Sequence, residues 1–327
     1  MSDGRPPAGP ARPPDPKGAA IAIGIFDGVH LGHRAILERA RERAAGGRCV
    51  VVSFDPHPDV VLARGAFHSP PPLTPLGEKR ELMLALGIGE FLVLPFTREL
   101  AALSPEEFVD AHLVHPFAPR ALVVGEGFAL GRGRSGTVER LRAIGARCGF
   151  EVESVPLVTI DGAPVSSTRI RALLAEGRVE EAARLLGRHY ALAGIVVTGD
   201  ARGRTLGFPT ANLRLHEERW LPADGVYAVL ARIGGEREAR PAAMSIGMRP
   251  TFDGQVRTLE VHLIDWAGEL LGRELAVEFV AWLRPELRFE SAQALADAMS
   301  ADVAEARRRL AGGGAASSGE APARRGR

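Results

Sequence analysis

The sequence predicts two consecutive domains, an α/β domain with a parallel sheet and an all-β domain, and three observations support this fold class. The length of 327 residues exceeds the roughly 250–300 residues at which a single hydrophobic core stops growing. Short apolar segments alternate with amphipathic helical patterns up to about residue 187, which is typical of a parallel sheet with helices on both faces. From about residue 188 onward, strand patterns follow one another directly between Gly, Pro and Asp turns.

In the first domain, residues 19–187, five apolar segments predict buried strands and the amphipathic patterns between and after them predict helices. The strand segments are 21–26, 48–54, 90–96, 120–128 and 150–160. The helical segments are 34–45, 77–87, 104–115, 137–149 and 165–177. Ser104, Pro105 and Glu107 form a capping-box pattern with proline at the first helical position. Ligands of such sheets bind beyond the carboxyl ends of the strands, where loops enter helices.

In the second domain, residues 188–311, six strand patterns are followed by one helical pattern. The strand segments are 190–199, 209–215, 225–233, 237–247, 258–266 and 273–283. Their even spacing predicts a small antiparallel barrel or a sandwich. The closing helix is expected over 291–310, with Ser291 as its N-cap.

The composition argues against several classes of function. The 41 Lys and Arg residues balance the 40 Asp and Glu residues, so no global field favours nucleic acid or a membrane surface. No apolar run is long enough to span a membrane, and the N-terminus lacks an apolar secretion segment. Cys49 and Cys148 have no metal-ligand spacing and are expected to be buried thiols of a cytoplasmic protein. Residues 1–18 and 312–327 are expected to be disordered tails.

The stretch GIFDGVHLGHR, residues 24–34, leaves the first predicted strand and enters a helix. Backbone N–H groups and the helix dipole favour an anion at such a turn. His30 and His33 add hydrogen-bond donors, and the glycines allow a close approach to phosphate oxygens. The pattern suits adenylyl or cytidylyl transfer, in which charge gathers on a pentavalent phosphorus. The alternative is a capped turn with two incidental histidines.

The stretch VSSTRIR, residues 165–171, places hydroxyl groups and cations at a second helix start. Its polar residues are Ser166, Ser167, Thr168, Arg169 and Arg171. Arginine in the first turn opposes the helix dipole, which makes sense if an anion binds there. A Ser/Thr N-cap with solvated arginines is the alternative, and it explains the hydroxyls but not the arginines.

Two polar patterns lie on strands of the second domain. Thr210 and Asn212 are two residues apart, so they face the same side of an extended strand. A hydroxyl and an amide suit Mg²⁺, which takes few protein ligands beside nucleotide phosphates, although a polar strand edge is the simpler explanation. In TLEVHLIDW, Glu260 shares a face with His262, so this carboxylate is either a surface charge or a general base.

Taken together, these motifs resemble those of a known family. GIFDGVHLGH and VSSTRIR resemble the nucleotidyltransferase superfamily, and SFDPHP, LTPLGEKRELMLALGI and LSPEEFVDAHL resemble the bacterial bifunctional riboflavin kinase/FMN adenylyltransferase (FAD synthetase) family. In the second half, GRTLGFPTAN, TLEVHLIDW, SIGMRPTF and LRPELRFES resemble the kinase module of that family. The resemblance implies a Rossmann-like nucleotidyltransferase domain, followed by a six-stranded antiparallel barrel of Greek-key type with a closing helix.

For the first domain, the resemblance implies adenylylation of FMN to FAD with release of pyrophosphate. His30 and His33 are then expected to promote adenylyl transfer. The residues implied in binding ATP are Asp27, Gly32, Ser167, Thr168 and Arg171. Phe128 is implied in flavin binding.

For the second domain, the resemblance implies phosphorylation of riboflavin to FMN by ATP and Mg²⁺. Glu260 is expected to be the general base that takes the proton from the ribityl hydroxyl. Thr210 and Asn212 are implied as metal ligands. The ATP loop is expected to include Gly199, Arg202 and Gly203, and Arg284 is implied in flavin binding.

Two alternatives stay open. Ile25 stands where the family usually has Asn, and Gly127 and Leu130 stand where it usually has a polar and an aromatic residue. These departures motivate a chain with an active kinase and a weakened or altered adenylyltransferase. The other alternative is a non-catalytic flavin-binding regulator. The expected partners are ATP, riboflavin, FMN and FAD, with no nucleic acid or membrane, and the chain is expected to be a monomer or a weak homo-oligomer.

Overall fold

The computed structural model describes residues 18–62, 69–199, 207–251 and 254–312. Contacts within the chain divide it into two compact units, residues 1–165 (unit 1) and 166–327 (unit 2), and each is described by itself. Nearly all of the two expected tails lies outside the described residues.

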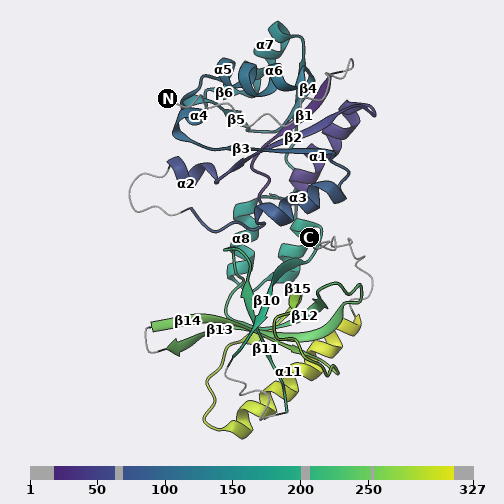
Figure 1. Cartoon of the computed structure of the whole chain (residues 1–327), viewed down its shortest axis with the longest axis vertical. Coiled ribbons are helices and arrows are strands. Elements are labelled where there is room, and N and C mark those ends of the chain that lie inside the picture. The colour runs from purple at the N-terminus through teal and green to yellow at the C-terminus, as the bar shows by residue number, and fades with distance from the viewer. Residues whose placement is uncertain (1–17, 63–68, 200–206, 252–253, 313–327) are drawn as a thin grey trace. The chain divides into compact units, whose positions relative to one another are not determined.

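Unit 1 contains a five-stranded sheet in which all neighbouring strands run parallel (Figure 1). The spatial order of the strands is β3-β2-β1-β4-β7. Their bounds are β1 (Ala19–Ile23), β2 (Cys49–Asp55), β3 (Glu90–Pro95), β4 (Pro119–Gly125) and β7 (Glu151–Val155). The predicted parallel sheet is therefore confirmed, with strand ends shifted by a few residues.

Helices cover both faces of this sheet. The helices are α1 (Leu31–Ala44), α2 (Pro58–Leu62), α3 (Leu76–Ala85), α4 (Arg98–Ala102), α5 (Pro105–Val109), α6 (His115–Phe117) and α7 (Val138–Cys148). Ile21 of β1 packs with Phe108 and Leu141, whereas the next residue, Ala22, packs with Leu37 on the opposite face. Successive strand residues point to opposite faces, so the all-apolar strand β1 is buried on both sides.

Smaller elements complete unit 1. They are the π-helical turn η1 (Asp110–Val114), the 3₁₀ turn η2 (Arg132–Arg134), and the strand pairs β5 (Ala129–Leu130) with β6 (Gly136–Thr137) and β8 (Thr159–Ile160) with β9 (Ala163–Pro164). The helix expected over 104–115 begins with the predicted capping box, but it passes into η1. Pro116 lacks the N–H of a regular helix, which accounts for the irregular end.

The strand order places a topological switch point between β1 and β4. The chain proceeds from β1 to β2 and β3 on one side, and later to β4 and β7 on the other. At such a point the carboxyl ends of the two central strands border a crevice suited to ligands. The loops 24–30 and 126–128 leave these two strands at that edge.

Unit 2 is a closed antiparallel barrel of six strands in the order β10-β11-β14-β13-β12-β15 (Figure 1). Their bounds are β10 (Tyr190–Val197), β11 (Ala211–Leu215), β12 (Gly225–Ile233), β13 (Arg240–Thr251), β14 (Gly254–Leu263) and β15 (Glu274–Pro285). Strands β12, β13 and β14 form successive hairpins, and β15 returns to pair with β12, which is a Greek-key arrangement. The structure therefore has the barrel and not the sandwich.

The closing helix α11 (Ala292–Gly312) packs on the barrel through small residues. Ala306 contacts Ala228 and Ala281, which allows helix and strands to approach closely. The hydroxyl of Ser291 accepts the N–H of Ala294 at 3.1 Å, so the predicted N-cap is confirmed. Figure 1 shows α11 in yellow beside the barrel.

Two further helices, α8 (Ser167–Ala175) and α9 (Val179–Leu186), are attached to the barrel. The carbonyl of Leu174 accepts the N–H of Ala223 at 2.8 Å. The Glu180 carboxylate accepts the N–H of Trp282 at 3.3 Å. Gly177, with φ of +76°, lies so close to the Trp282 ring that a Cβ would collide with it. These contacts explain why residues 166–187 belong to unit 2.

The two cysteines are both free thiols but differ in exposure. Cys49 is half-buried in β2, and burial raises the pKa of its thiol to about 11. Cys148 is exposed, so its predicted burial is wrong. It is the last residue of α7, where the amphipathic helix turns this position toward solvent.

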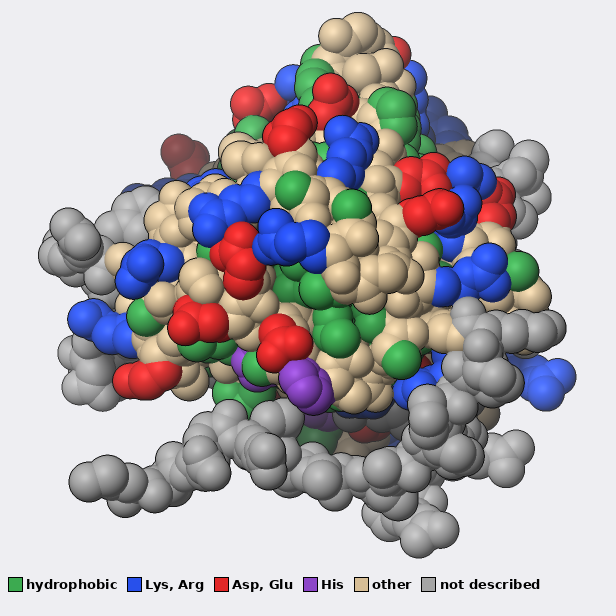
Figure 2. Space-filling model, turned by 90° about the horizontal axis from the view of Figure 1, so that it is seen from above, with side chains coloured by type: hydrophobic (Ala, Val, Ile, Leu, Met, Phe, Trp, Pro, Cys, Tyr) green, Lys and Arg blue, Asp and Glu red, His purple; other side chains and the backbone are tan. Residues whose placement is uncertain are grey.

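Charged side chains are mixed on the surface. On the face seen in Figure 2, basic and acidic side chains alternate, and no large patch of one sign covers the described residues. Within the described ranges, no helix combines the length and the apolar character that crossing a bilayer requires.

Candidate functional sites

The loop between β1 and α1 has an unusual backbone. Phe26, Gly28 and Val29 have φ angles of 53°, 88° and 41°, in the left-handed region. Valine is β-branched and strongly disfavours this region, so the surrounding structure must hold the loop in place. The side chains of Phe26 and Val29 are buried, and the N–H of Val29 donates to the Phe26 carbonyl at 3.2 Å.

The two predicted histidines meet at the start of α1. His30 is the N-cap, and its Nδ1 accepts the N–H of His33 at 3.3 Å. The two rings stack with centroids 3.6 Å apart and planes at 16°. A Cβ on Gly32 would come within 3.2 Å of the His30 ring, so glycine leaves room for this ring to lie against the helix. The sequence motif thus produces two imidazoles side by side at a helix N-terminus.

A cation accompanies the histidines in the first turn of α1. Burial lowers the pKa of the Arg34 guanidinium, which means that it is partly withdrawn from water. Its Nε is buried and has no hydrogen-bond partner among the described residues. A cation at a helix N-terminus opposes the dipole, so this arrangement favours an anionic ligand.

Asp27 anchors the loop to the segment before α3. Its side chain is only 5% exposed. The carboxylate accepts the backbone N–H groups of Leu73 at 3.2 Å and Thr74 at 3.1 Å. The structure therefore places this predicted ATP-binding residue as a buried support of the loop.

Ile25 contributes its backbone carbonyl to the support of the same loop. This carbonyl accepts the Ser53 hydroxyl at 3.1 Å and the Lys79 ammonium at 2.9 Å. The Ile25 side chain packs against the apolar core on one face of the sheet. An apolar residue at this position is thus accommodated without loss of the polar anchors.

Lys79 is a buried residue bonded to this loop that the sequence did not single out. It is 6% exposed, and burial lowers the pKa of its ammonium group while Asp27 and Asp55 act in the opposite direction. Composition held a signal for it, because Lys17 and Lys79 are the only lysines in a chain with 41 basic residues.

Phe128 lies in the loop after β4, the neighbour of β1. Its N–H donates to the Gly125 carbonyl at 3.1 Å, and its ring is half-buried against the sheet core. Gly127 has φ of +76° and open space where a Cβ would lie, so glycine serves the turn. Leu130 is buried in the same core. The structure brings Phe128 and the histidine loop to the same edge of the sheet.

The other predicted phosphate-binding residues, Ser167, Thr168 and Arg171, lie at the start of α8 in unit 2. The Ser166 hydroxyl caps this helix by accepting the N–H of Arg169 at 3.2 Å. The Arg171 guanidinium lies over the Trp220 ring, 5.8 Å from its centroid. The first turn contains no acidic residue, so it keeps the positive character that suits a phosphate.

In the barrel, the predicted metal ligands and the predicted base come together. Asn212 of β11 and Glu260 of β14 are direct cross-strand partners. The Thr210 hydroxyl donates to the Glu260 carboxylate at 3.1 Å. On β14 the neighbours Leu259 and Val261 are buried while Glu260 is partly exposed, so the predicted alternation is confirmed.

Gly199 follows β10 and lies against the Asn212 amide. A Cβ at Gly199 would overlap this amide, so only glycine allows the close approach. Val197 pairs with Asn212 in the sheet, which fixes the position of the turn. Arg202 and Gly203, the other residues expected in the ATP loop, lie outside the described residues.

The donor set in the barrel fits a small divalent cation. A hydroxyl and an amide oxygen, from Thr210 and Asn212, are oxygen donors that Mg²⁺ accepts beside nucleotide phosphates and water, and the Glu260 carboxylate lies next to them. In the part of the chain that is described, no group of three or more His, Cys, Asp or Glu side chains could hold a metal ion.

Arg284, which is predicted to contact the flavin, is held at the end of β15 by an ion pair. Its guanidinium makes a two-pronged ion pair with Asp302 of α11, at 2.8 and 2.7 Å. It also lies over the Phe289 ring at 5.6 Å. Asp302 is 9% exposed, so the pair joins the end of β15 to the closing helix inside the unit.

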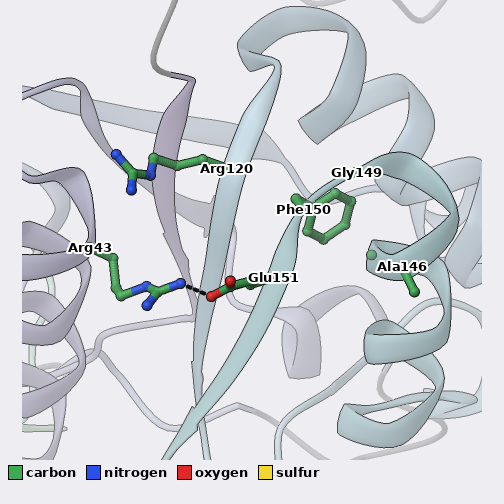
Figure 3. Close-up of a pocket in the computed structure, with 7 residues that line it drawn as sticks. Arg43, Arg120, Ala146, Gly149, Phe150 and Glu151 are labelled. Atoms are coloured by element: carbon green, nitrogen blue, oxygen red, sulfur yellow. Dashed lines mark hydrogen bonds and ion pairs between the residues drawn. The ribbon is translucent and has the colours of Figure 1, made fainter.

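A hollow of about 380 Å³ is present in unit 1, and Figure 3 shows residues that line it. Its lining includes Arg120 of β4 and Glu151 of β7, which lie at the amino ends of their strands. Figure 3 shows Arg43 directed at Glu151, with which it forms an ion pair. None of the predicted site residues lines this hollow.

Comparison with known proteins adds two family matches. A family described as FAD synthetase matches residues 12–169, and a family described as riboflavin kinase matches residues 186–310. A bifunctional riboflavin kinase/FMN adenylyltransferase from Pseudomonas fluorescens is 42% identical over 297 residues, which cover 90% of this chain and 94% of that protein. The protein of the same description from Listeria monocytogenes is 40% identical over 290 residues, with coverages of 88% and 91%.

One solved structure matches almost the whole fold. It is a crystal structure from Streptococcus pneumoniae of a protein described as a macrolide-efflux protein. The TM-score is 0.81 at 31% sequence identity, over 89% of this chain and 94% of that chain.

Proposed function

The chain belongs to the bifunctional riboflavin kinase/FMN adenylyltransferase family, and from this premise we propose how its residues perform the two reactions. The protein is a transferase that phosphorylates riboflavin to FMN and adenylylates FMN to FAD. The observation that carries the assignment is the pairing of Asn212 with Glu260 on adjacent strands of the barrel, together with the hydrogen bond from Thr210 to Glu260. The solved structure from Streptococcus pneumoniae is described as a macrolide-efflux protein, and we do not extend that description to this chain.

For adenylyl transfer, we assign the anion-binding groups to the histidine loop. A phosphate oxygen of FMN attacks the α-phosphorus of ATP, and the bond to the leaving pyrophosphate breaks. His30 and His33 donate hydrogen bonds to phosphate oxygens as charge gathers on them, and the start of α1 adds its N–H groups. We also assign Ser167, Thr168 and Arg171 to binding ATP phosphates, Asp27 and Gly32 to shaping the loop, and Phe128 to the flavin side.

For phosphoryl transfer, Glu260 acts as the general base. Its carboxylate takes the proton from the terminal ribityl hydroxyl of riboflavin, whose oxygen attacks the γ-phosphorus of ATP while the bond to ADP breaks. The Thr210 hydroxyl, hydrogen-bonded to Glu260 at 3.1 Å, orients the carboxylate. Gly199 leaves room for the Asn212 amide and for the ATP loop, to which we also assign Arg202 and Gly203.

Both families use ATP, generally with a divalent metal ion. We propose Mg²⁺ in the barrel, held by Thr210 and Asn212, and it would neutralise charge on the transferring phosphoryl group. Arg284 is assigned to the flavin side of the barrel, and its ion pair with Asp302 connects the end of β15 to α11. We further propose a cytoplasmic monomer or weak homo-oligomer whose partners are ATP, riboflavin, FMN and FAD.

One experiment tests the assignment and its rivals. Purified protein is incubated with ATP and Mg²⁺ and with either riboflavin or FMN, and the products are separated by chromatography. We expect FMN and then FAD from riboflavin, and FAD from supplied FMN. FMN without FAD at any enzyme concentration would instead support a weakened adenylyltransferase, which the departures at Ile25, Gly127 and Leu130 motivate. Flavin binding without any turnover would support a regulator.

A further inference from the structure

Lys79 of α3 is a buried cation that the two reactions above do not use. Its side chain is 6% exposed, and its ammonium donates to the Ile25 carbonyl at 2.9 Å. That carbonyl also accepts the Ser53 hydroxyl, so it does not depend on Lys79 for a partner. Burying an ammonium group is unfavourable, and an apolar side chain of the same length would fill this place without that cost. Stability therefore does not account for the lysine.

The charge of the histidine loop offers a reason for it. Asp27 places a buried carboxylate inside a loop that has to accept a triphosphate. Asp55, an exposed residue at the end of β2, adds a second carboxylate whose charge acts on Lys79. Such negative charges repel an anionic ligand, and the low dielectric around the buried Asp27 carboxylate strengthens its repulsion.

We propose that Lys79 is a positioning residue for adenylyl transfer, whose buried ammonium offsets the carboxylates of Asp27 and Asp55 so that the loop accepts the triphosphate of ATP. Asp27 is needed because it holds the N–H groups of Leu73 and Thr74 and so fixes the loop. The positive charge of Lys79 offsets the repulsion between the Asp27 carboxylate and the phosphates of ATP. The inference deepens the function proposed for the first site and rests on it.

The chemistry of the side chain explains why this cation is a lysine. The lysine ammonium is a compact group with three N–H donors at the end of a four-carbon chain, whereas the arginine guanidinium is a larger planar group. At Lys79 the stem is enclosed, and the head reaches a single carbonyl. Every other described basic residue of the chain, apart from the histidines, is an arginine.

The test measures ATP dependence of FAD formation from FMN by wild type and Lys79→Met. In the variant we expect the KM for ATP to rise roughly tenfold to a hundredfold, because one positive charge that favours the polyanion is lost. The kcat for FAD should change much less. Formation of FMN from riboflavin, measured on the same samples, should stay at the wild-type rate because it takes place in the barrel.

Two controls separate charge from a lost hydrogen bond or a damaged fold. Ser53→Ala removes the other donor to the Ile25 carbonyl without changing charge, and it should leave the KM for ATP close to wild type. Adding Asp27→Asn to Lys79→Met removes the uncompensated carboxylate, so it should recover part of the lost ATP affinity. A misfolded loop would not be rescued in this way.

Ionic strength gives a further readout that a structural role would not move. Salt screens attraction between the wild-type site and ATP, so the wild-type KM rises with added KCl. In Lys79→Met, salt also screens the repulsion between the carboxylates and ATP. The increase of the KM for ATP with added KCl should therefore become smaller or reverse. An unchanged KM in Lys79→Met, equal effects of Ser53→Ala and Lys79→Met, or no rescue by Asp27→Asn would each overturn the proposal. If wild type makes no FAD from FMN, the proposed function fails and this inference fails with it.

Discussion

Two sites position their polar groups by different physical means: the histidine loop of unit 1, residues 24–33, and the strand site of unit 2, which consists of Thr210, Asn212 and Glu260. In the loop, the side chains depend on left-handed backbone at Phe26, Gly28 and Val29 and on anchors from distant segments. In the barrel, Asn212 and Glu260 face each other because of the strand register. A loop site is therefore sensitive to buried groups that never touch the substrate, whereas a strand site is sensitive mainly to its own residues.

The largest effect is expected for Glu260, the general base of the barrel site. Replacing Glu260 with Ala removes the proton acceptor and should lower FMN formation by about 10²–10⁴-fold. FAD formation from supplied FMN should remain, because the reaction takes place at the other site. Product chromatography with each flavin measures both rates. Loss of both activities in a folded variant would show that the two sites do not work separately.

The next effect is expected in the histidine loop. His30→Ala removes a stacked, capping imidazole and a donor to phosphate, and should lower the kcat for FAD formation by about 10²–10³-fold. Riboflavin phosphorylation should continue. His115→Ala is the matched control, since that histidine is exposed on α6, and it should leave both rates unchanged. Equal losses in the two variants would contradict the role of the loop.

A smaller effect tests how closely the strand site is packed. Gly199→Ala pushes the Asn212 amide from its place, and we expect the KM for ATP in riboflavin phosphorylation to rise about tenfold, which corresponds to about 1.4 kcal/mol of binding. Gly89→Ala is a control in open space, and it should have no effect on either reaction. Wild-type kinetics in Gly199→Ala would mean that the amide takes no part in ATP or metal binding.

The smallest effect on turnover is expected from the ion pair between β15 and α11. Asp302→Ala leaves the Arg284 guanidinium without its partner and should lower the free energy of unfolding by about 1–3 kcal/mol. All three tryptophans, Trp220, Trp266 and Trp282, lie in unit 2, so their fluorescence reports unfolding of this unit within the full chain. Asp265→Ala breaks an exposed pair between the same helix and barrel, and it should change stability little.

The sequence predicted the central strands and most of the longer helices, because these depend on local patterns, but it did not predict α2, α4 or α9. Alternation of apolar and polar residues located β14, and the apolar run of β1 located a strand buried on both faces. The capping box at Ser104 and the N-cap at Ser291 were predicted from a few neighbouring residues and are present. Such signals need only a few consecutive residues.

The sequence did not predict contacts that join distant segments. The bond from Lys79 to the Ile25 carbonyl spans 54 positions, and the pair between Arg284 and Asp302 joins a strand to a helix. Hydrophobic periodicity does not indicate which distant residue a side chain will contact, because each of these residues alone is compatible with a solvated surface. The exposure of Cys148 was missed for a related reason, since cysteine usually prefers the interior and only the rotation of α7 places it outside.

The attachment of α8 and α9 to the barrel has a consequence for how such genes can recombine. A crossover at residue 187, where the amphipathic helices end, would separate this helical pair from the bonds that Leu174 and Glu180 make to the barrel. A crossover at residue 165 would keep those bonds intact. Chimeric proteins from related genes should therefore fold better with the breakpoint at residue 165. The kinase barrel would then be exchanged together with α8, the helix that contains Arg171.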